Sequence, residues 1–221
     1  MVNPCDFSYN NKNTSTYRGK NNHTISWRLI MIRFATENEN EEDIRQINEL
    51  TYSILETMDL EFIQQTPKET FLTFLATLFE KEGNRFSYHN FLLSELEGRI
   101  AAIAIVYHYE DAVYYDHQLS SEIAAFFKIQ APVIQLEAKP DEYYLDSIAV
   151  AEDFRNQKIG TMLLEAVEEE AYDKGYQKLS LNVEHSNNRA KRLYERFEFT
   201  ELEQFDLYGH PYYHMVKHLI G

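Results

Sequence analysis

Between residues 143 and 173 the hydrophobic pattern changes from that of a strand to that of a helix. Residues 143–150 are rich in aromatic and β-branched side chains and end at a polar run, which predicts a buried strand. From residue 159, apolar residues recur at spacings of three and four, which predicts an amphipathic helix. Lys174 and Gly175 then supply a cation for the last turn and a left-handed cap. This stretch therefore predicts a strand, a turn and a helix in succession.

The N-terminal half predicts a strand, two helices and a hairpin. The strand begins at residues 30–34, and residues 38–58 and 67–81 have helical periodicity. The second helix is expected to start after Thr66 as N-cap, with Pro67 at its first position. Its apolar stripe consists of Phe71, Phe74, Leu75, Leu78 and Phe79. Residues 91–96 and 100–107 flank Glu97-Gly98, a hairpin signal.

A long connection over residues 109–140 separates this hairpin from the strand at 143. It is expected to contain a helix over residues 121–130 and to end between Pro132 and Pro140. Long ordered insertions at the end of a sheet often carry recognition. A lid or a dimer contact is an equally open interpretation, and a homodimer is one of the partners we consider.

The C-terminal part predicts a strand at 178–183, a helix at 187–197 and an antiparallel pair at 199–208 and 212–219. His210, His214 and His218 fall on the last strand. Four residues along a strand span about 13 Å, too far for two side chains to share one ion. We therefore expect no metal site there.

Composition limits the possible classes of protein. The 221 residues are 44% hydrophobic and 14% aromatic, enough for one well-packed domain, and the one cysteine, Cys5, favours a reducing cytoplasm. A formal charge of −15 argues against broad nucleic-acid binding and fits a cationic acceptor, although acidic charge also serves solubility. We expect no membrane association. Residues 1–30 are polar without an apolar period, so they are expected to form a flexible extension that is dispensable, with the domain at 31–221.

The turn before the helix at 159 has the features of an anion site. A turn that feeds a helix start points several unpaired N–H groups in one direction, at the positive end of the helix dipole. Arg155 and Lys158 add two cations. In a chain this acidic, the turn favours a phosphate or a pyrophosphate.

Two motifs resemble those of the GNAT superfamily of N-acetyltransferases. That family's acyl-CoA-binding loop runs Arg or Gln, two residues, Gly, one residue, then Gly or Ala; Arg155 and Gly160 match its ends, and Lys158 replaces the first glycine. A lysine suits that place if the backbone there does not need a positive φ. The later signature is matched by five residues, with Glu198 in place of a glycine. The matching residues are Asn187, Ala190, Leu193, Tyr194 and Phe199.

The resemblance covers about residues 31–219 and implies a fold and a cosubstrate. The fold is mixed α/β (α+β), with a mostly antiparallel central sheet of six to seven strands, about four flanking helices and an extra helical insertion before the central strand. The cosubstrate is acetyl-CoA, with no metal. The residues expected to bind it are Ile148, Ala149, Val150, Arg155, Asn156, Gln157, Lys158, Ile159, Gly160, Thr161, Asn187, Ala190 and Tyr194.

Acetyl transfer to an amine requires a base and an acid. A free alkylamine with a pKa near ~10.4 is protonated at neutral pH, so a group must take its proton. Asp146 is the candidate, on the face it is expected to share with Ile148 and Val150; a structural acceptor is the alternative, and Glu142 is an outside option. By resemblance, Tyr194 protonates the departing thiolate.

Two hypotheses of function follow from this resemblance. The first is an N-acetyltransferase acting on a primary amine of a small molecule, a polyamine or a peptide. The second is a catalytically inactive CoA-binding sensor or interaction module, which Lys158 and Glu198 favour because both replace glycines. Retention of Asn187 and Tyr194 favours the enzyme.

Overall fold

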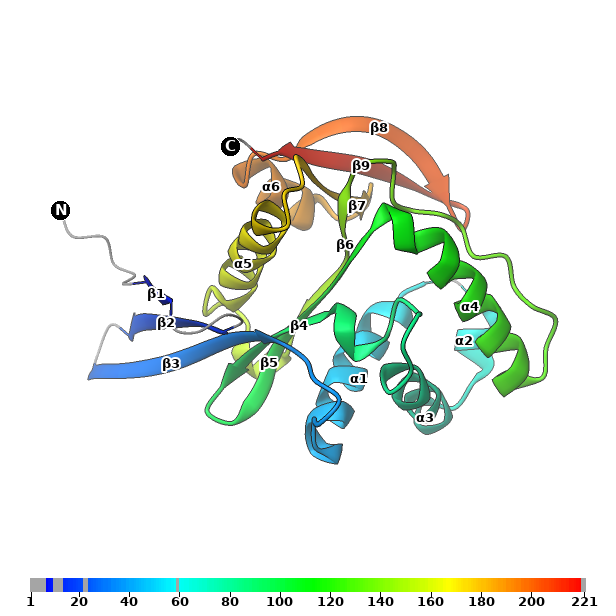
Figure 1. Ribbon diagram of the computed structural model, residues 1–221, viewed down its shortest axis with the longest axis horizontal. Helices are drawn as coiled ribbons and strands as arrows, with labels where there is room; N and C mark the ends of the chain where they lie inside the picture. Colours follow the sequence, from blue (N-terminus) through cyan, green and yellow to red (C-terminus); the bar gives the residue numbers. More distant parts are fainter. Residues whose placement is uncertain (1–6, 10–13, 22–23, 59, 220–221) are drawn as a thin grey trace.

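A nine-stranded sheet runs through the described part of the chain, with helices on both faces (Figure 1). This computed structural model describes residues 7–9, 14–21, 24–58 and 60–219, with side chains from residue 30 onward. The strands are β1 (Phe7–Tyr9), β2 (Thr14–Asn21), β3 (Thr24–Phe34), β4 (Phe91–Leu96), β5 (Arg99–His108), β6 (Tyr143–Val150), β7 (Lys178–Glu184), β8 (Thr200–Leu207) and β9 (His210–His218). The helices are α1 (Glu41–Leu55), α2 (Glu61–Gln65), α3 (Lys68–Phe79), α4 (Tyr109–Phe127), α5 (Ile159–Asp173) and α6 (Asn188–Arg196).

The sheet is mixed but mostly antiparallel, as predicted. Its order is β1-β2-β3-β4-β5-β6-β7-β9-β8, and among the described strands the one parallel pair is β6 with β7. Strands β3 to β9 form the expected seven-stranded core of the sheet, and β1 and β2 extend it at one edge. The hairpin between β4 and β5 turns at Glu97 and Gly98, both with positive φ.

The central strand β5 is buried on both faces because helices cover both sides of the sheet. Ala102 and Ala104 belong to the cluster under α5, where small side chains let that helix approach closely. Ile103, Ile105 and Tyr107 belong to the second cluster, under α1, α3 and α4. Strands covered on both faces become continuously hydrophobic, as β5 is.

The helix boundaries differ slightly from those predicted in the N-terminal half. α1 begins after Asn40, whose side chain accepts the backbone N–H of Asp43. α3 begins at Lys68 with Pro67 as its N-cap, one residue later than expected, and its predicted stripe is buried. The short helix α2 between them was not predicted.

The insertion helix is longer than predicted and begins at Tyr109, directly after β5. Its buried residues are Ala112, Asp116, Leu119 and Ile123, which follow a helical spacing. The apolar periodicity of the first half of this helix is not evident in the sequence because Asp116 occupies one of the four buried positions. The structure thus corrects the expected range of 121–130.

The structure also corrects the expectation of a loose segment before residue 30. β1, β2 and the first part of β3 lie there, and β2 pairs with β3 from Thr14 opposite Arg33 to Asn21 opposite Thr24. A hairpin held by backbone pairing needs no apolar period, so the sequence pattern did not reveal it. Cys5 lies outside the described residues.

A β-bulge in β6 creates the space in which the site lies. Ile105 of β5 pairs with Ser147 and the next residue, Val106, pairs with Leu145, so Asp146 is the extra residue. The parallel ladder of β6 with β7 also ends at Leu145, opposite Leu181. Beyond this point the two strands diverge.

The bulge changes which side chains share a face of β6. Ile148 and Val150 pack against the cluster under α5. Asp146 points to the opposite side, where it contacts Arg85 and Tyr107. The expectation that Asp146 shares a face with Ile148 and Val150 is therefore wrong, because the extra residue shifts the alternation by one.

Candidate active site

A cleft of about 640 Å³ opens where β6 leaves β7. Its walls come from the second half of β6, the start of α5 and one side of α6. Twelve of the thirteen residues that sequence analysis assigned to cosubstrate binding line it; Gln157 does not. The lining residues among them are Ile148, Ala149, Val150, Arg155, Asn156, Lys158, Ile159, Gly160, Thr161, Asn187, Ala190 and Tyr194.

The turn at the start of α5 adopts the conformation usual for glycine without glycine. Asn156 has φ of 62° and Lys158 has φ of 64°, both left-handed. From the sequence, a lysine is expected to suit this position only if the backbone does not need a positive φ. The position does have a positive φ, and Lys158 adopts it at a cost of about 1 kcal/mol. Such αL residues before a helix turn backbone N–H groups towards a common concavity that suits an anion.

Contacts within the turn fix its shape. The side chain of Arg155 donates to the carbonyl of Val150 at 3.3 Å, and the side chain of Gln157 donates to the carbonyl of Asp153 at 3.1 Å. Gly160 is needed for close approach, because a Cβ there would lie 3.1 Å from Cγ2 of Val150. The start of α5 is therefore held against the end of β6.

Tyr194 is held by both ends of the short helix α6. The side chain of Asn187 caps the first turn by accepting the N–H of Ala190 at 3.1 Å. At the other end, the N–H of Phe199 donates to the carbonyl of Tyr194 at 3.0 Å, and that of Glu198 donates to the carbonyl of Glu195 at 3.1 Å. These two bonds form a Schellman motif.

The hydrophobic contact typical of that motif is also present. The rings of Tyr194 and Phe199 lie 5.8 Å apart, edge to face. Glu198 occupies the left-handed position with φ of 66°, where glycine is usual. Tyr194 is 8% exposed, and burial raises its pKa to about 12. The phenol is therefore protonated at neutral pH.

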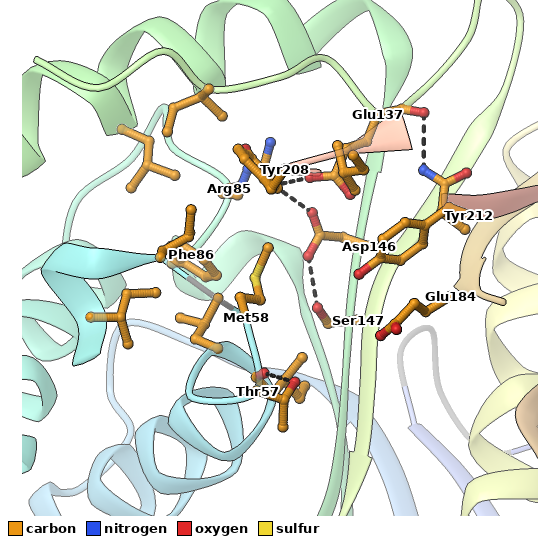
Figure 2. Close-up of a pocket in the computed structure, with 18 of the residues that line it drawn as sticks. Thr57, Met58, Arg85, Phe86, Glu137, Asp146, Ser147, Glu184, Tyr208 and Tyr212 are labelled. Carbon is orange, nitrogen blue, oxygen red and sulfur yellow. Dashed lines mark hydrogen bonds and ion pairs between the residues drawn. The ribbon is translucent and has the colours of Figure 1, made fainter. Parts of the chain in front are cut away.

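A second cavity, of about 240 Å³, also has Tyr194 in its wall. Figure 2 labels other residues of its lining, among them Arg85, Glu137 and Asp146. Asn187, Ala190 and Tyr194 line both spaces, so the two meet at the face of α6. Its polar wall includes Arg85, Glu137, Asp146, Glu184, Tyr208 and Tyr212.

Asp146 lies in a buried cluster of charges at this wall. Its carboxylate accepts from Arg85 at 3.0 Å, from the hydroxyl of Tyr107 at 2.6 Å and from the hydroxyl of Ser147 at 2.8 Å. The same guanidinium donates to Glu137 at 3.0 Å and to Asp116. These donors favour the structural-acceptor interpretation that the sequence left open for Asp146.

One cation thus faces three carboxylates in a largely buried cluster. The side chains of Arg85, Asp116, Glu137 and Asp146 are each 10% exposed or less. Burial raises the pKa of Glu137 and that of Asp116, and the positive charge of Arg85 only partly opposes this shift. The cluster therefore favours binding a proton or another cation.

Arg85, Asp116 and Glu137 were not predicted from the sequence. Arg85 lies in the connection after α3, Asp116 in the misassigned part of α4, and Glu137 in the segment before β6. None of these three segments carries a recognised motif. One signal was available in principle: Asp116 is a charged residue in an otherwise apolar helical phase.

Glu142, the outside option for a base, does not line the second cavity. Its carboxylate accepts from Ser180 at 2.7 Å and lies 3.1 Å from Nε2 of His214. Nδ1 of His214 lies 2.8 Å from Oδ1 of Asn182, whose amide donates to the hydroxyl of Tyr144 at 2.9 Å. Tyr144 in turn donates to Glu137 at 2.9 Å. Glu142 is thus connected to Glu137 through a chain of hydrogen bonds that runs through His214, Asn182 and Tyr144.

The described residues contain neither a metal cluster nor a membrane-spanning helix. No group of His, Cys, Asp and Glu in them is arranged to hold a metal ion. Within the same residues, no helix combines the length and apolar character needed to cross a membrane.

The chain matches known proteins over most of its length. Residues 51–199 match the model of the acetyltransferase (GNAT) family. A crystal structure of an acetyltransferase is 34% identical with a TM-score of 0.72, covering 85% of this chain and 98% of that one. An N-acetyltransferase from Staphylococcus aureus Mu50 is 29% identical with a TM-score of 0.71, covering 85% and 100%.

A more distant structure shares the fold alone. The NatC complex bound to Gag peptide and CoA is 13% identical with a TM-score of 0.50, covering 86% of this chain and 99% of that one. No curated protein matches the chain.

Proposed function

The chain belongs to the GNAT family of acetyltransferases, and on that premise we propose that it transfers the acetyl group of acetyl-CoA to a primary amine of a small molecule, a polyamine or a peptide. The observation that carries this proposal is the position of Tyr194 between two cavities. One cavity suits the cosubstrate and the other the acceptor.

The residues of the larger cleft fit acetyl-CoA, which supplies a reactive thioester when bound. The turn from Arg155 to Thr161 would hold the pyrophosphate through its backbone amides, with Arg155 and Lys158 adding positive charge. Both cations are exposed and lie at the helix start. This arrangement supports the assignment made from the sequence.

The free edge of β6 would hold the pantetheine arm. The ladder with β7 ends at Leu145, so main-chain groups around Ile148 and Val150 can pair with an amide-bearing chain, as in strand addition. Ala190 leaves clearance on the opposite wall. Asn187 uses its side-chain oxygen to cap α6, so its amide nitrogen is the group it would offer.

Tyr194 would act as the general acid. The amine nitrogen, after losing its ammonium proton to water, attacks the acetyl carbonyl carbon and the carbon–sulfur bond breaks. The phenol gives its proton to the departing thiolate, and the phenolate takes the remaining proton from the acylated nitrogen. A pKa of about 12 keeps the phenol protonated before transfer. Burial raises the pKa of a thiol as well as that of a phenol, which offsets part of the rise in the pKa of the tyrosine.

The structure weakens the basis of the sensor hypothesis. Lys158 and Glu198 replace glycines of the family pattern, but both hold the left-handed conformation that the glycines would adopt. The turn and the Schellman motif are therefore kept. What remains of that hypothesis is binding without turnover.

Release of free CoA in the presence of an amine panel tests the proposal. The protein is incubated with acetyl-CoA and each amine, and thiol release is compared with that from acetyl-CoA alone. We expect amine-dependent release and an acetylated product by mass spectrometry. Binding of acetyl-CoA without release against any amine would contradict the enzyme and support the sensor.

A further inference from the structure

The second cavity is smaller than most ligand sites. Its volume of about 240 Å³ lies below the roughly 300–1,000 Å³ typical of small-molecule pockets. At about 30 Å³ for each water, this space equals the volume of about eight water molecules. A compact molecule fits it.

The segment between α4 and β6 forms part of the wall of the second cavity, through Ile134 and Glu137. We name residues 128–142 the strap; in Figure 1 it returns alongside α4 towards β9 before entering β6. The backbone N–H of Tyr208 donates to the side chain of Gln135 at 2.6 Å, and the N–H of Gln135 donates to the hydroxyl of Tyr208 at 3.2 Å. The strap is thereby tied to the connection between β8 and β9.

Two further contacts hold the strap at its ends. The hydroxyl of Ser120 in α4 donates to the carbonyl of Pro132 at 2.6 Å. Lys139 forms an ion pair with Glu203 of β8 at 2.5 Å. An extended peptide laid across this side of the sheet would have to displace these contacts.

The cavity has an apolar end and a charged end. Figure 2 shows Met58 and Phe86 on one side, with Glu137, Asp146, Glu184 and Tyr212 on the other. The apolar side continues with residues of α2, α3, α4 and the strap, which are Phe62, Phe74, Leu119, Ile123 and Ile134. A ligand with a second charge would have to place that charge against the apolar side, where it would be neither solvated nor paired. The cavity therefore favours a ligand with one cationic group.

Of the two carboxylates of this cavity that bond to Arg85, Glu137 is better suited than Asp146 to receive that cation. Asp146 accepts from three side-chain donors, whereas Glu137 accepts from two, Arg85 and Tyr144. The groups facing Glu137 also include Asp146 and Tyr208, and the guanidinium of Arg85 is shared between Glu137 and Asp146, so the negative charge at Glu137 is only partly neutralised. Nε of Arg85, buried in the same wall, has no hydrogen-bond partner among the described residues and is a further polar group at this end.

We propose that the acceptor is a compact primary monoamine with an apolar body, enclosed whole in this cavity with its ammonium group at Glu137. This inference rests on the proposed function and narrows its acceptor class. It assigns to the 109–140 insertion the recognition role that the sequence left open, since the insertion supplies Glu137, Ile134 and the strap.

Comparison of three acceptors on the wild-type protein tests this assignment. Initial rates are measured with saturating acetyl-CoA and 2-phenylethylamine, spermidine or a hexapeptide with a free N-terminal alanine. We expect kcat/KM for 2-phenylethylamine to exceed the other two by about 100-fold. Equal or better use of the peptide or of spermidine overturns the inference and leaves the acetyltransferase standing. Turnover of none of the three, with acetyl-CoA still bound, overturns both.

A matched pair of variants tests the role of Glu137. Glu137→Gln should raise KM for 2-phenylethylamine about 10-fold or more, because a neutral amide binds an ammonium less well, with KM for acetyl-CoA unchanged. Glu80→Gln, an exposed change at the end of α3, should change neither. Equal amine KM values in Glu137→Gln and wild type contradict the assignment. Should Glu137→Gln not fold, the acceptor comparison decides.

Discussion

At the scale of single residues, Tyr194 is the position on which the chemistry depends. The Schellman motif and the ring of Phe199 fix its backbone and its side chain, and its neighbours open to both cavities. Of the site, the sequence predicted the residues that belong to local motifs. It could not predict Arg85 or Glu137, because their meeting depends on long-range packing.

Replacing Tyr194 with phenylalanine removes the proposed acid without changing the packing. Tyr194→Phe should lower kcat about 100-fold while the Kd for acetyl-CoA, measured by calorimetry, stays nearly unchanged. Tyr172→Phe, at an exposed tyrosine of α5 that lines neither cavity, serves as the control. Equal turnover in Tyr194→Phe and wild type would remove the acid role.

Glu198 gives a test of backbone strain beside the same residue. Its φ of 66° is unfavourable for a residue with a Cβ but not for glycine, and its side chain is largely exposed, near Lys217. Glu198→Gly should therefore raise the free energy of unfolding by about 1 kcal/mol, as measured by urea denaturation. A loss of stability in this variant would contradict the strain assigned to the left-handed cap.

At the scale of elements, the bulge in β6 explains both a success and a failure of prediction. The strand, the turn and α5 were predicted because each has a strong local period or a cap, such as Gly175 with φ of 82°. The face of Asp146 was mispredicted because one extra residue reverses the alternation beyond it. A bulge has no reliable signal in a single sequence.

The pairing of β6, β7 and β9 depends on buried charge. Burial acts to raise the pKa of Glu142, but hydrogen bonds with His214 and Ser180 outweigh it and hold the pKa of that carboxyl below its ordinary value. A carboxyl with a lowered pKa in the folded state stabilises the protein above its unfolded pKa. That contribution is lost as pH falls through the folded pKa.

This linkage gives a prediction for acid conditions. Glu142→Gln should be less stable than wild type at pH 7 by about 3 kcal/mol, and the gap should narrow as the pH is lowered below about 4.5. Urea unfolding of both proteins at pH values of about 7, 4.5 and 3.5 measures it. A gap that stays constant over this range would contradict the assigned role of the carboxylate.

At the scale of the whole molecule, the sheet brings two cavities together at one helix. The overall fold was predicted from the two motifs and the order of elements, whereas the N-terminal strands were not. β3 pairs with β4 between Ile30 and Phe34, so most of this pairing survives without the preceding residues.

We propose on this basis that residues 1–30 are dispensable. A chain beginning at Met31 should unfold cooperatively and bind acetyl-CoA with the affinity of the full chain. A chain beginning at Thr24 keeps Ile30, which is 6% exposed, and should be more stable by about 1–3 kcal/mol. Thermal unfolding by circular dichroism measures both. A Met31 chain without a cooperative transition would refute the domain boundary.

A crystal structure of the full chain with CoA bound tests the central claim most directly. We expect the pyrophosphate on the turn from Arg155 to Thr161, the pantetheine arm along β6, and the sulfur within hydrogen-bonding reach of the hydroxyl of Tyr194. CoA bound with its sulfur outside the space that the two cavities share, or away from that hydroxyl, would contradict it.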